Sequence, residues 1–255
     1  MTAPLGRGRP ARAAFLRLAR ARHLILFLDL DGTLAPLVER PDDARVPRAT
    51  RQVLARLRGG GVRVVLVSGR SVAAVRRIAR LAPDAILGDH GARLWRSGKT
   101  SPWLPADPAR LARICRRLAP ELATLPGVRL ERKDRSLAIH LRLPRKGAPG
   151  TIRRITTMLE REGLRVLRGR QVIDAQLPRV DKGRAVRRWL RAEPPADAVV
   201  YAGDDTTDQD AFAALTGRAV TVAVGPRVRG ARFRTRDPET FARWLRRLAD
   251  ARGTP

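Results

Sequence analysis

The sequence predicts an α/β fold with a doubly wound parallel sheet at its core and an α+β domain inserted into it. Three observations predict this class. Short apolar runs alternate with helical segments in the first and last thirds of the chain, as in a parallel sheet covered by helices. Acidic clusters directly follow two of those runs, where open α/β sheets bind ligands. In the middle third the pattern changes to alternating polar and apolar residues, which is typical of antiparallel strands.

The first third of the chain contains the first helices and strands of the predicted core. The segment 11–20 has the spacing of a short amphipathic helix, and the apolar run 23–30, which contains Asp29, predicts a buried parallel strand. Three glycines at 59–61 end the next predicted helix. The other elements of this part are helices at 50–58 and 72–81 and strands at 62–67 and 85–87.

The middle of the chain predicts a separate α+β domain. In the segment 136–143 leucine and isoleucine alternate with Ser136, Ala138, His140 and Arg142, so we expect a half-buried strand with two different faces. The other elements predicted here are a partner strand at 165–174 and helices at 108–118 and 151–162.

The last third returns to the parallel pattern. A helix at 182–191 precedes an apolar strand at 197–202, which leads into the acidic segment 203–208. The remaining core elements are a helix at 208–215, a strand at 219–224 and a helix at 240–248. The predicted domains are therefore a core of residues 1–94 and 177–255 and an inserted domain of residues 95–176.

Composition limits the classes of function. The chain has 255 residues, a formal net charge of +29 and one cysteine, Cys115, which excludes an internal disulfide. No apolar segment reaches the ~20 residues that span a bilayer, so we expect no membrane partner and a cytoplasmic location. The arginines are spread along the whole chain, without the interleaved aromatic residues of single-strand-binding surfaces. This distribution favours a generic basic surface over a surface that attracts anionic substrates or binds nucleic acid. We also expect the protein to be a monomer.

Two acidic clusters indicate a metal site. Asp29 and Asp31 follow the first apolar strand, and Asp204 and Asp208 follow the strand at 197–202. If both strands lie in one sheet, their carboxyl ends bring the two clusters together. Clustered carboxylates repel one another, and Mg²⁺ relieves that repulsion because it binds carboxylates, waters and phosphate oxygens. Helix capping explains each acid alone, but it does not explain the pair of clusters.

Two further residues suit phosphate chemistry. Ser68 follows the strand at 62–67, where its hydroxyl can donate to a phosphoryl oxygen or cap the next helix. Lys182 begins a helix in a chain that otherwise uses lysine only at positions 99, 133 and 146. A compact ammonium can contact a phosphoryl oxygen and a carboxylate together, whereas a planar guanidinium fits less well. A carboxylate such as Asp29 can attack phosphorus and form an aspartyl-phosphate.

These pieces, in this order, resemble the haloacid dehalogenase superfamily of phosphohydrolases. The resemblance rests on the segment 29–33, Ser68, Lys182 and the segment 203–208, and it extends over nearly the whole chain. It implies a Rossmann-like core of the haloacid dehalogenase type. The segments that look like trehalose-6-phosphate phosphatases, in which the insert is a mobile α+β cap, are 88–91, 131–133, 136–142, 180–183 and 203–208.

The resemblance implies a role for each site residue. Asp29 would be the nucleophile and Asp31 the general acid/base, while Ser68 and Lys182 would hold the phosphoryl group. The residues that would bind Mg²⁺ or support its site are Asp29, Asp31 through its backbone carbonyl, Asp204 and Asp208. The positions expected to contact the substrate are Gly69, Arg70, His90, Glu131, Lys133, Arg142, Arg170 and Asp174.

Some positions depart from the family pattern. Asp174 stands where glutamate is usual, and Gln176 and Leu177 replace an Arg-Pro pair. For His90, a hydrogen-bonded structural role is an equal alternative. We expect a sugar phosphate as substrate, with trehalose 6-phosphate first and sucrose, mannosylglycerate or glucosylglycerate phosphate as alternatives. A basic nucleic-acid-binding protein is the alternative of another class, and it leaves the two acidic clusters unexplained.

Overall fold

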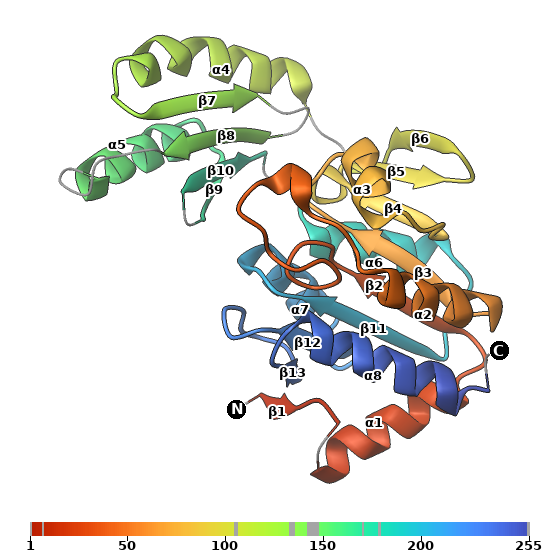
Figure 1. The fold of residues 1–255 in the computed structure, drawn as a ribbon. Coiled ribbons are helices and arrows are strands. Elements are labelled where there is room, and N and C mark those ends of the chain that lie inside the picture. Colours follow the sequence, from red (N-terminus) through yellow and green to blue (C-terminus); the bar gives the residue numbers. More distant parts are fainter. Residues whose placement is uncertain are drawn as a thin grey trace. The chain divides into compact units, whose positions relative to one another are not determined.

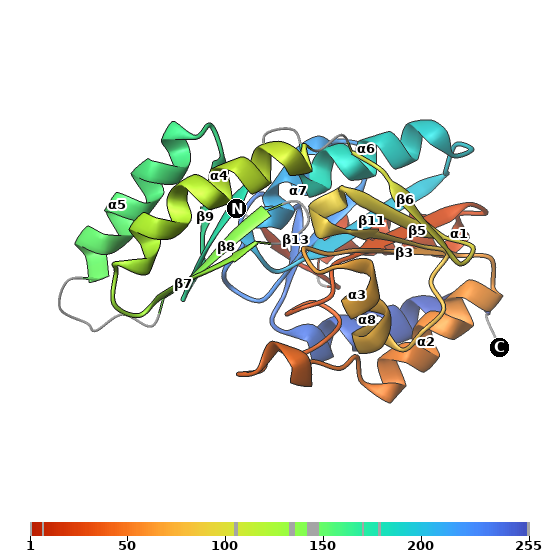
Figure 2. The same cartoon turned by 90° about the horizontal axis from the view of Figure 1, so that it is seen from above.

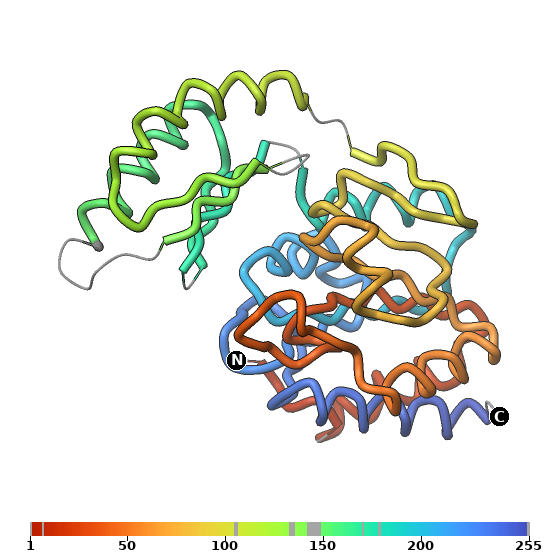
Figure 3. The backbone as a smooth tube through the Cα atoms, turned by 45° about the horizontal axis from the view of Figure 1, so that its top comes forward, coloured from red at the N-terminus to blue at the C-terminus, as the bar shows by residue number. Residues whose placement is uncertain are grey.

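The chain folds into two units. The computed structural model describes residues 2–6, 8–104, 107–132, 136–141, 148–169, 171–177 and 180–253. The larger unit combines Met1–Trp103 with Asp181–Pro255, and the smaller unit is Leu104–Val180. The chain thus passes from the larger unit into the smaller one and back again, as the tube in Figure 3 shows.

A nine-stranded sheet forms the centre of the larger unit (Figure 1). Its strands, in spatial order, are β1 (Ala3–Pro4), β13 (Phe233–Thr235), β12 (Val220–Val224), β11 (Ala198–Gly203), β2 (Leu24–Leu28), β3 (Arg63–Val67), β4 (Ala85–Gly88), β5 (Arg93–Arg96) and β6 (Lys99–Pro102). Neighbours from β1 to β4 pair in parallel, whereas β5 and β6 extend the sheet as an antiparallel hairpin. The predicted parallel α/β core is confirmed, with an antiparallel extension that the sequence did not indicate.

Helices cover both faces of this sheet (Figure 2). One face packs against α1 (Gly8–Arg20), α2 (Arg48–Gly59), α3 (Val72–Ala79) and α8 (Pro238–Ala251), and the other against α6 (Lys182–Ala192) and α7 (Gln209–Ala214). Because both faces are covered, every residue of β2 is 0% exposed, which explains its uninterrupted apolar sequence. Among the described residues, no helix combines the length and the apolar character needed to cross a membrane.

Side-chain caps determine where several helices begin. Asp181 Oδ1 accepts the backbone N–H of Arg184 at 2.7 Å in front of α6. Asp237 does the same in front of α8, where its Oδ1 accepts the N–H of Thr240 at 2.7 Å. Such caps satisfy backbone donors that have no partner within the helix. The cap of α6 thereby makes Lys182 the first residue of that helix.

The smaller unit is an antiparallel sheet with two helices. Its strands, in spatial order, are β7 (Val128–Arg132), β8 (Ser136–Leu141), β10 (Val172–Gln176) and β9 (Arg165–Arg168), and its helices are α4 (Pro108–Ala123) and α5 (Ala148–Arg161). The prediction of one strand over 165–174 is wrong. The chain reverses between Arg168 and Val172, where the N–H of Gly169 donates to Val172 O at 2.8 Å, so this segment forms two paired strands.

The strand β8 is more buried than its alternating sequence predicts. All of its residues except His140 are buried, since β8 lies between β7 and β10 in the middle of its sheet. Ala138, for example, pairs with Glu131 on β7 and with Asp174 on β10 and is 0% exposed. Positions 142 and 143 of the predicted strand lie outside the described residues.

The boundary between the units differs from the position expected from the sequence. The smaller unit begins at Leu104, whereas the sequence places the start of the insert at residue 95. The hairpin of β5 and β6 accounts for the difference, because β5 pairs with β4 and so belongs to the core sheet. These two strands are short, and β6 is exposed along its whole length, so neither shows an apolar run.

Candidate active site

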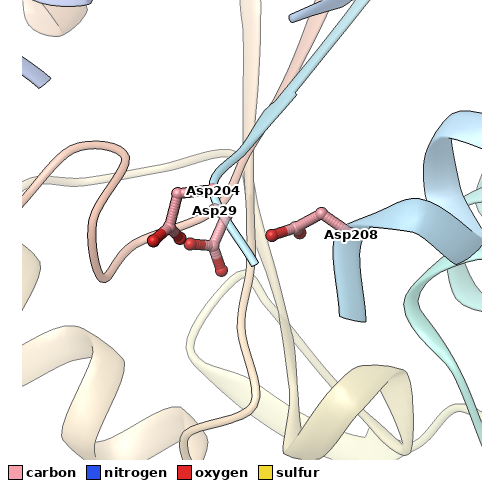
Figure 4. A group of neighbouring side chains, drawn as sticks. All are labelled: Asp29, Asp204 and Asp208. Carbon is pink, nitrogen blue, oxygen red and sulfur yellow. The ribbon is translucent and has the colours of Figure 1, made fainter. Parts of the chain in front are cut away.

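Three buried aspartates meet at the carboxyl ends of β2 and β11. Asp29 follows β2, Asp204 follows β11, and Asp208 ends the 3-10 turn η3 (Thr206–Asp208). One carboxylate oxygen of each lies within 4.8 Å of the others, and their carboxylates point toward one another (Figure 4). Their exposed fractions are 5%, 7% and 0%. The two acidic clusters of the sequence therefore come together, because β2 and β11 pair in parallel.

Two glycines make this close approach possible. Gly32 has φ +76, and a Cβ atom at this position would collide with the Asp204 carboxylate. At Gly203, a Cβ atom would collide with the side chain of Asp208. The turn after β2 is closed by the N–H of Gly32, which donates to Ala35 O at 2.7 Å. Only glycine accommodates both the positive φ and the neighbouring carboxylate at position 32.

Lys182 lies among these acids. Its Nζ donates to Asp29 Oδ1 at 2.7 Å and to Asp208 Oδ1 at 2.8 Å, and the residue is 3% exposed. Three carboxylates and one ammonium carry a net charge of −2 when all are ionised. This charge and the hard oxygen donors fit one divalent cation.

The pKa values of the group reflect its burial. Burial raises the pKa of Asp29 well above its ordinary value, and the charge of Lys182 offsets this only in part. Burial and the charge of Asp208 raise the pKa of Asp204 to about 7. Burial also disfavours the charge of Lys182, but Asp208 and Asp29 outweigh it, so the pKa of Lys182 is raised. Raised pKa values of this kind are expected for buried carboxylates that lie close together without a cation to offset their mutual repulsion.

Asp31 has a different partner. Arg70 binds it through two hydrogen bonds, from Nε to Oδ2 at 2.6 Å and from Nη2 to Oδ1 at 2.8 Å. Both side chains are partly buried, with 30% of Asp31 and 21% of Arg70 exposed. Such a two-point pair fixes the orientation of the carboxylate. The structure thus joins Arg70, expected to contact the substrate, to the expected acid/base residue.

Ser68, Gly69 and His90 form one local cluster at the carboxyl ends of β3 and β4. Ser68 is 1% exposed and its Oγ accepts the N–H of Arg70 at 3.1 Å. The N–H of His90 donates to Ser68 O at 3.0 Å. The imidazole lies so close to Gly69 that a Cβ atom there would collide with it. His90 therefore packs on the backbone at positions 68 and 69.

In the smaller unit, Glu131 and Asp174 share one face of the sheet, because each pairs with Ala138 on β8. Glu131 Oε2 lies 2.6 Å from His140 Nε2, and Asp174 Oδ2 accepts Gln176 Nε2 at 2.8 Å. Of the other residues expected to contact the substrate, the ones that lie outside the described residues are Lys133, Arg142 and Arg170.

Tyr201 is a residue of the site that the sequence does not indicate. This residue of β11 is 0% exposed, and its hydroxyl donates to Asp208 Oδ1 at 2.7 Å. Its position within an apolar run gives no sign of a polar role. A tyrosine buried in a central strand needs a hydrogen-bond partner, but the sequence does not show that this partner is Asp208.

Comparison with known proteins places these residues in a family. The family model for trehalose-phosphatase matches residues 27–232, a range that contains Asp29, Ser68, Lys182, Asp204 and Asp208. A trehalose-phosphate phosphatase of Mycobacterium avium (strain 104) is 34% identical over 252 residues, which are 90% of this chain and 63% of that relative. The chain therefore spans less than two thirds of the length of this relative.

Solved structures show the same fold. The C-terminal domain of a trehalose-6-phosphate phosphatase from C. albicans superposes with a TM-score of 0.81 at 23% identity and covers 98% of each chain. A phosphatase of the haloalkanoate (HAD) superfamily from Bacteroides thetaiotaomicron superposes with a TM-score of 0.66 at 17% identity, over 93% of this chain and 97% of that one. The fold is that of the HAD superfamily, and by its match to the family model the chain belongs to the trehalose-phosphatase family.

Proposed function

We propose that this chain is a magnesium-dependent phosphatase that hydrolyses a sugar phosphate, with trehalose 6-phosphate as its first candidate substrate. The observation that carries the proposal is the buried group of Asp29, Asp204 and Lys182 at the ends of two paired strands. The family of the chain supports the reaction class and the sugar. The other candidates are the phosphates of sucrose, mannosylglycerate and glucosylglycerate.

The metal site uses the carboxylates of Asp29 and Asp204 and the backbone carbonyl of Asp31. Asp208 supports this site through the hydrogen bond that it accepts from Lys182. Mg²⁺ suits hard oxygen donors, and when bound it offsets negative charge on the phosphoryl oxygens and on the carboxylates. The net charge of the buried group matches the charge of this ion.

Asp29 is the proposed nucleophile. One of its oxygens accepts a hydrogen bond from Lys182, which leaves the other free of that contact. Attack by this oxygen on phosphorus transfers the phosphoryl group to Asp29 and releases the sugar oxygen. Lys182 offsets the repulsion between the carboxylate and the phosphate dianion, and Ser68 donates its hydroxyl to a phosphoryl oxygen.

Asp31 is the proposed general acid and base. It gives a proton to the leaving sugar oxygen, and afterwards takes one from the water that attacks the aspartyl-phosphate. Arg70 holds both oxygens of this carboxylate. We therefore assign Arg70 to the orientation of Asp31.

Contacts to the sugar are proposed for Glu131 and Asp174. Each has a carboxylate on the same face of the four-stranded sheet, and carboxylates of this kind accept hydrogen bonds from sugar hydroxyls. The same role is proposed for Lys133, Arg142 and Arg170, which lie outside the described residues.

The test is a panel of sugar phosphates assayed for released phosphate with Mg²⁺ and after exhaustive chelation. We expect trehalose 6-phosphate to be turned over fastest and chelation to abolish turnover. Asp29→Asn should be inactive, because an amide is a poor nucleophile. Activity in this variant would remove the nucleophile assignment, and a clear preference for another sugar phosphate would remove the proposed substrate but keep the reaction.

A further inference from the structure

A buried tyrosine completes the hydrogen bonds around Asp208. Two donors share Asp208 Oδ1, the Tyr201 hydroxyl at 2.7 Å and Lys182 Nζ at 2.8 Å. The other oxygen, Oδ2, accepts the N–H of Asp205 at 3.1 Å. Asp208, Tyr201 and Lys182 are 0%, 0% and 3% exposed, so water does not compete for these bonds. Asp208 is thus held by the protein on both of its oxygens.

We infer that Tyr201 is a positioning residue, whose hydroxyl fixes the Asp208 carboxylate so that this carboxylate holds the Lys182 ammonium in place. The inference rests on the proposed function, in which Lys182 faces the nucleophile and the phosphoryl group. Asp208 then serves mainly to anchor the ammonium, and Asp29 and Asp204 carry the metal.

Packing alone does not explain a tyrosine at this position. The ring of Tyr201 meets Phe212 edge to face, with ring centroids 5.7 Å apart, and phenylalanine would make the same contact. Burying a hydroxyl is unfavourable unless it has a hydrogen-bond partner. The hydroxyl is therefore suited to hold a carboxylate.

The geometry shows how a change at Tyr201 reaches the nucleophile. Lys182 Nζ bridges Asp208 and Asp29 with distances of 2.8 and 2.7 Å. Without the phenol, Asp208 Oδ1 keeps only the ammonium as donor, and the carboxylate is held by two donors in place of three. One of the two acceptors of the ammonium is then less firmly fixed. The position of the ammonium beside the nucleophile becomes less well defined.

The test is Tyr201→Phe, which removes one oxygen and keeps the ring. We expect kcat to fall by about 10–100-fold, the usual effect of removing an outer hydrogen-bond partner of a site. KM for the sugar phosphate and the Mg²⁺ concentration for half-maximal rate should stay unchanged, because neither the sugar contacts nor Asp204 are altered. A loss confined to kcat distinguishes positioning from general destabilisation.

Thr221→Val is the matched control. Thr221 lies directly opposite Tyr201 on the neighbouring strand β12, is 4% exposed, and accepts the N–H of Arg232 at 2.8 Å with its hydroxyl. The variant removes a buried hydroxyl from the same sheet without touching a carboxylate. Urea unfolding should show a comparable loss of stability in both variants, while kcat falls only in Tyr201→Phe.

A double variant tests the path through Asp208. If the hydroxyl acts through this carboxylate, Tyr201→Phe should add no further loss of kcat in an Asp208→Asn background. Losses that multiply would overturn the inference, and so would a wild-type kcat in Tyr201→Phe. Absence of turnover in the wild-type protein would instead contradict the proposed function, so the two failures can be told apart.

Discussion

At the scale of single residues, the pair of Asp31 and Arg70 is the contact most open to a direct test. Arg70→Lys keeps the positive charge but loses the two-point hydrogen bond. Hydrogen bonds to charged groups are worth about 1.5–3 kcal/mol, so we expect kcat to fall by about 10–100-fold if the pair orients the acid/base residue. Steady-state kinetics on the preferred sugar phosphate measures this loss.

A surface pair provides the control for that variant. Arg77 binds Asp42 at 2.6 Å, with 49% of the arginine and 80% of the aspartate side chain exposed. Arg77→Lys is the same chemical change in an exposed ion pair, so its kcat should equal that of the wild type. An equal loss in both variants, or no loss in Arg70→Lys, would contradict the orienting role.

The raised pKa of Asp204 predicts how stability depends on pH when the protein is kept free of metal. The pKa is about 7 in the folded state against 3.8 for an ordinary aspartate, so folding favours the protonated form. This contribution is complete below about pH 4 and is lost progressively as the pH rises to about 7. Each pKa unit of difference is worth about 1.4 kcal/mol, so the loss is on the order of a few kcal/mol.

Urea unfolding in the presence of a chelator at pH 5, 6, 7 and 8 measures this dependence. The unfolding midpoint should fall between pH 5 and 7 and change less above pH 7. In Asp204→Asn, which cannot ionise, the fall should be clearly smaller, and what remains should come from Asp29, whose pKa is raised in the same direction. A midpoint that rises over this range would show that the carboxylates are stabilised as anions.

The sequence identified the acids of the site but not their partners. Asp29 and Asp204 were predictable because each directly follows an apolar run, and the ends of parallel strands meet at one edge of the sheet. The bond from Tyr201 to Asp208 and the pair of Arg70 with Asp31 were not predictable, because they depend on side-chain directions that only the packed strands and turns determine. Residue type and spacing locate a site, and packing decides which oxygen meets which donor.

At the scale of elements, the fully buried strands are the ones that the sequence predicts best. The central strands β2 and β11 are fully buried apolar runs, and the sequence predicted both. The edge strands β5 and β6 are short and partly or fully exposed, so they lack that signal. The sequence of β9 and β10 predicts one strand, because the turn at Gly169 interrupts the apolar pattern by only a few residues. Strands that depend on a neighbour for their burial cannot be recognised from their own residues alone.

One ion-pair network is predicted to anchor the end of α6 to the core sheet. Glu193, the residue after α6, is 8% exposed at its side chain and pairs with Arg63 of β3 at 3.0 Å and with Arg96 of β5. It therefore connects a helix end to two strands. Glu193→Ala should lower the free energy of unfolding by about 1–3 kcal/mol, because the two arginines lose their nearly buried carboxylate partner. Glu239→Ala, which breaks an exposed helical pair with Arg243, should cost clearly less. Equal effects in urea unfolding would contradict the anchor.

At the scale of the whole molecule, we expect folding and metal binding to be coupled through the buried acids. The folded chain holds three carboxylates around one ammonium, and this arrangement exists only when β2 and β11 are paired. A divalent cation that binds this group, but not the unfolded chain, stabilises the fold by mass action. The gain is about 2.7 kcal/mol when the free ion reaches 100 times its dissociation constant.

The measurement is thermal unfolding at pH 8 over a series of Mg²⁺ concentrations. The midpoint should rise with Mg²⁺ in the wild type and stay nearly constant in Asp204→Asn, which lacks one of the proposed ligands. At pH 6 the same ion should stabilise less, since Asp204 must first lose the proton that its pKa of about 7 retains. Equal stabilisation of both proteins would place the ion elsewhere on the molecule. An ion effect independent of pH would show that these carboxylates do not exchange their protons for the metal.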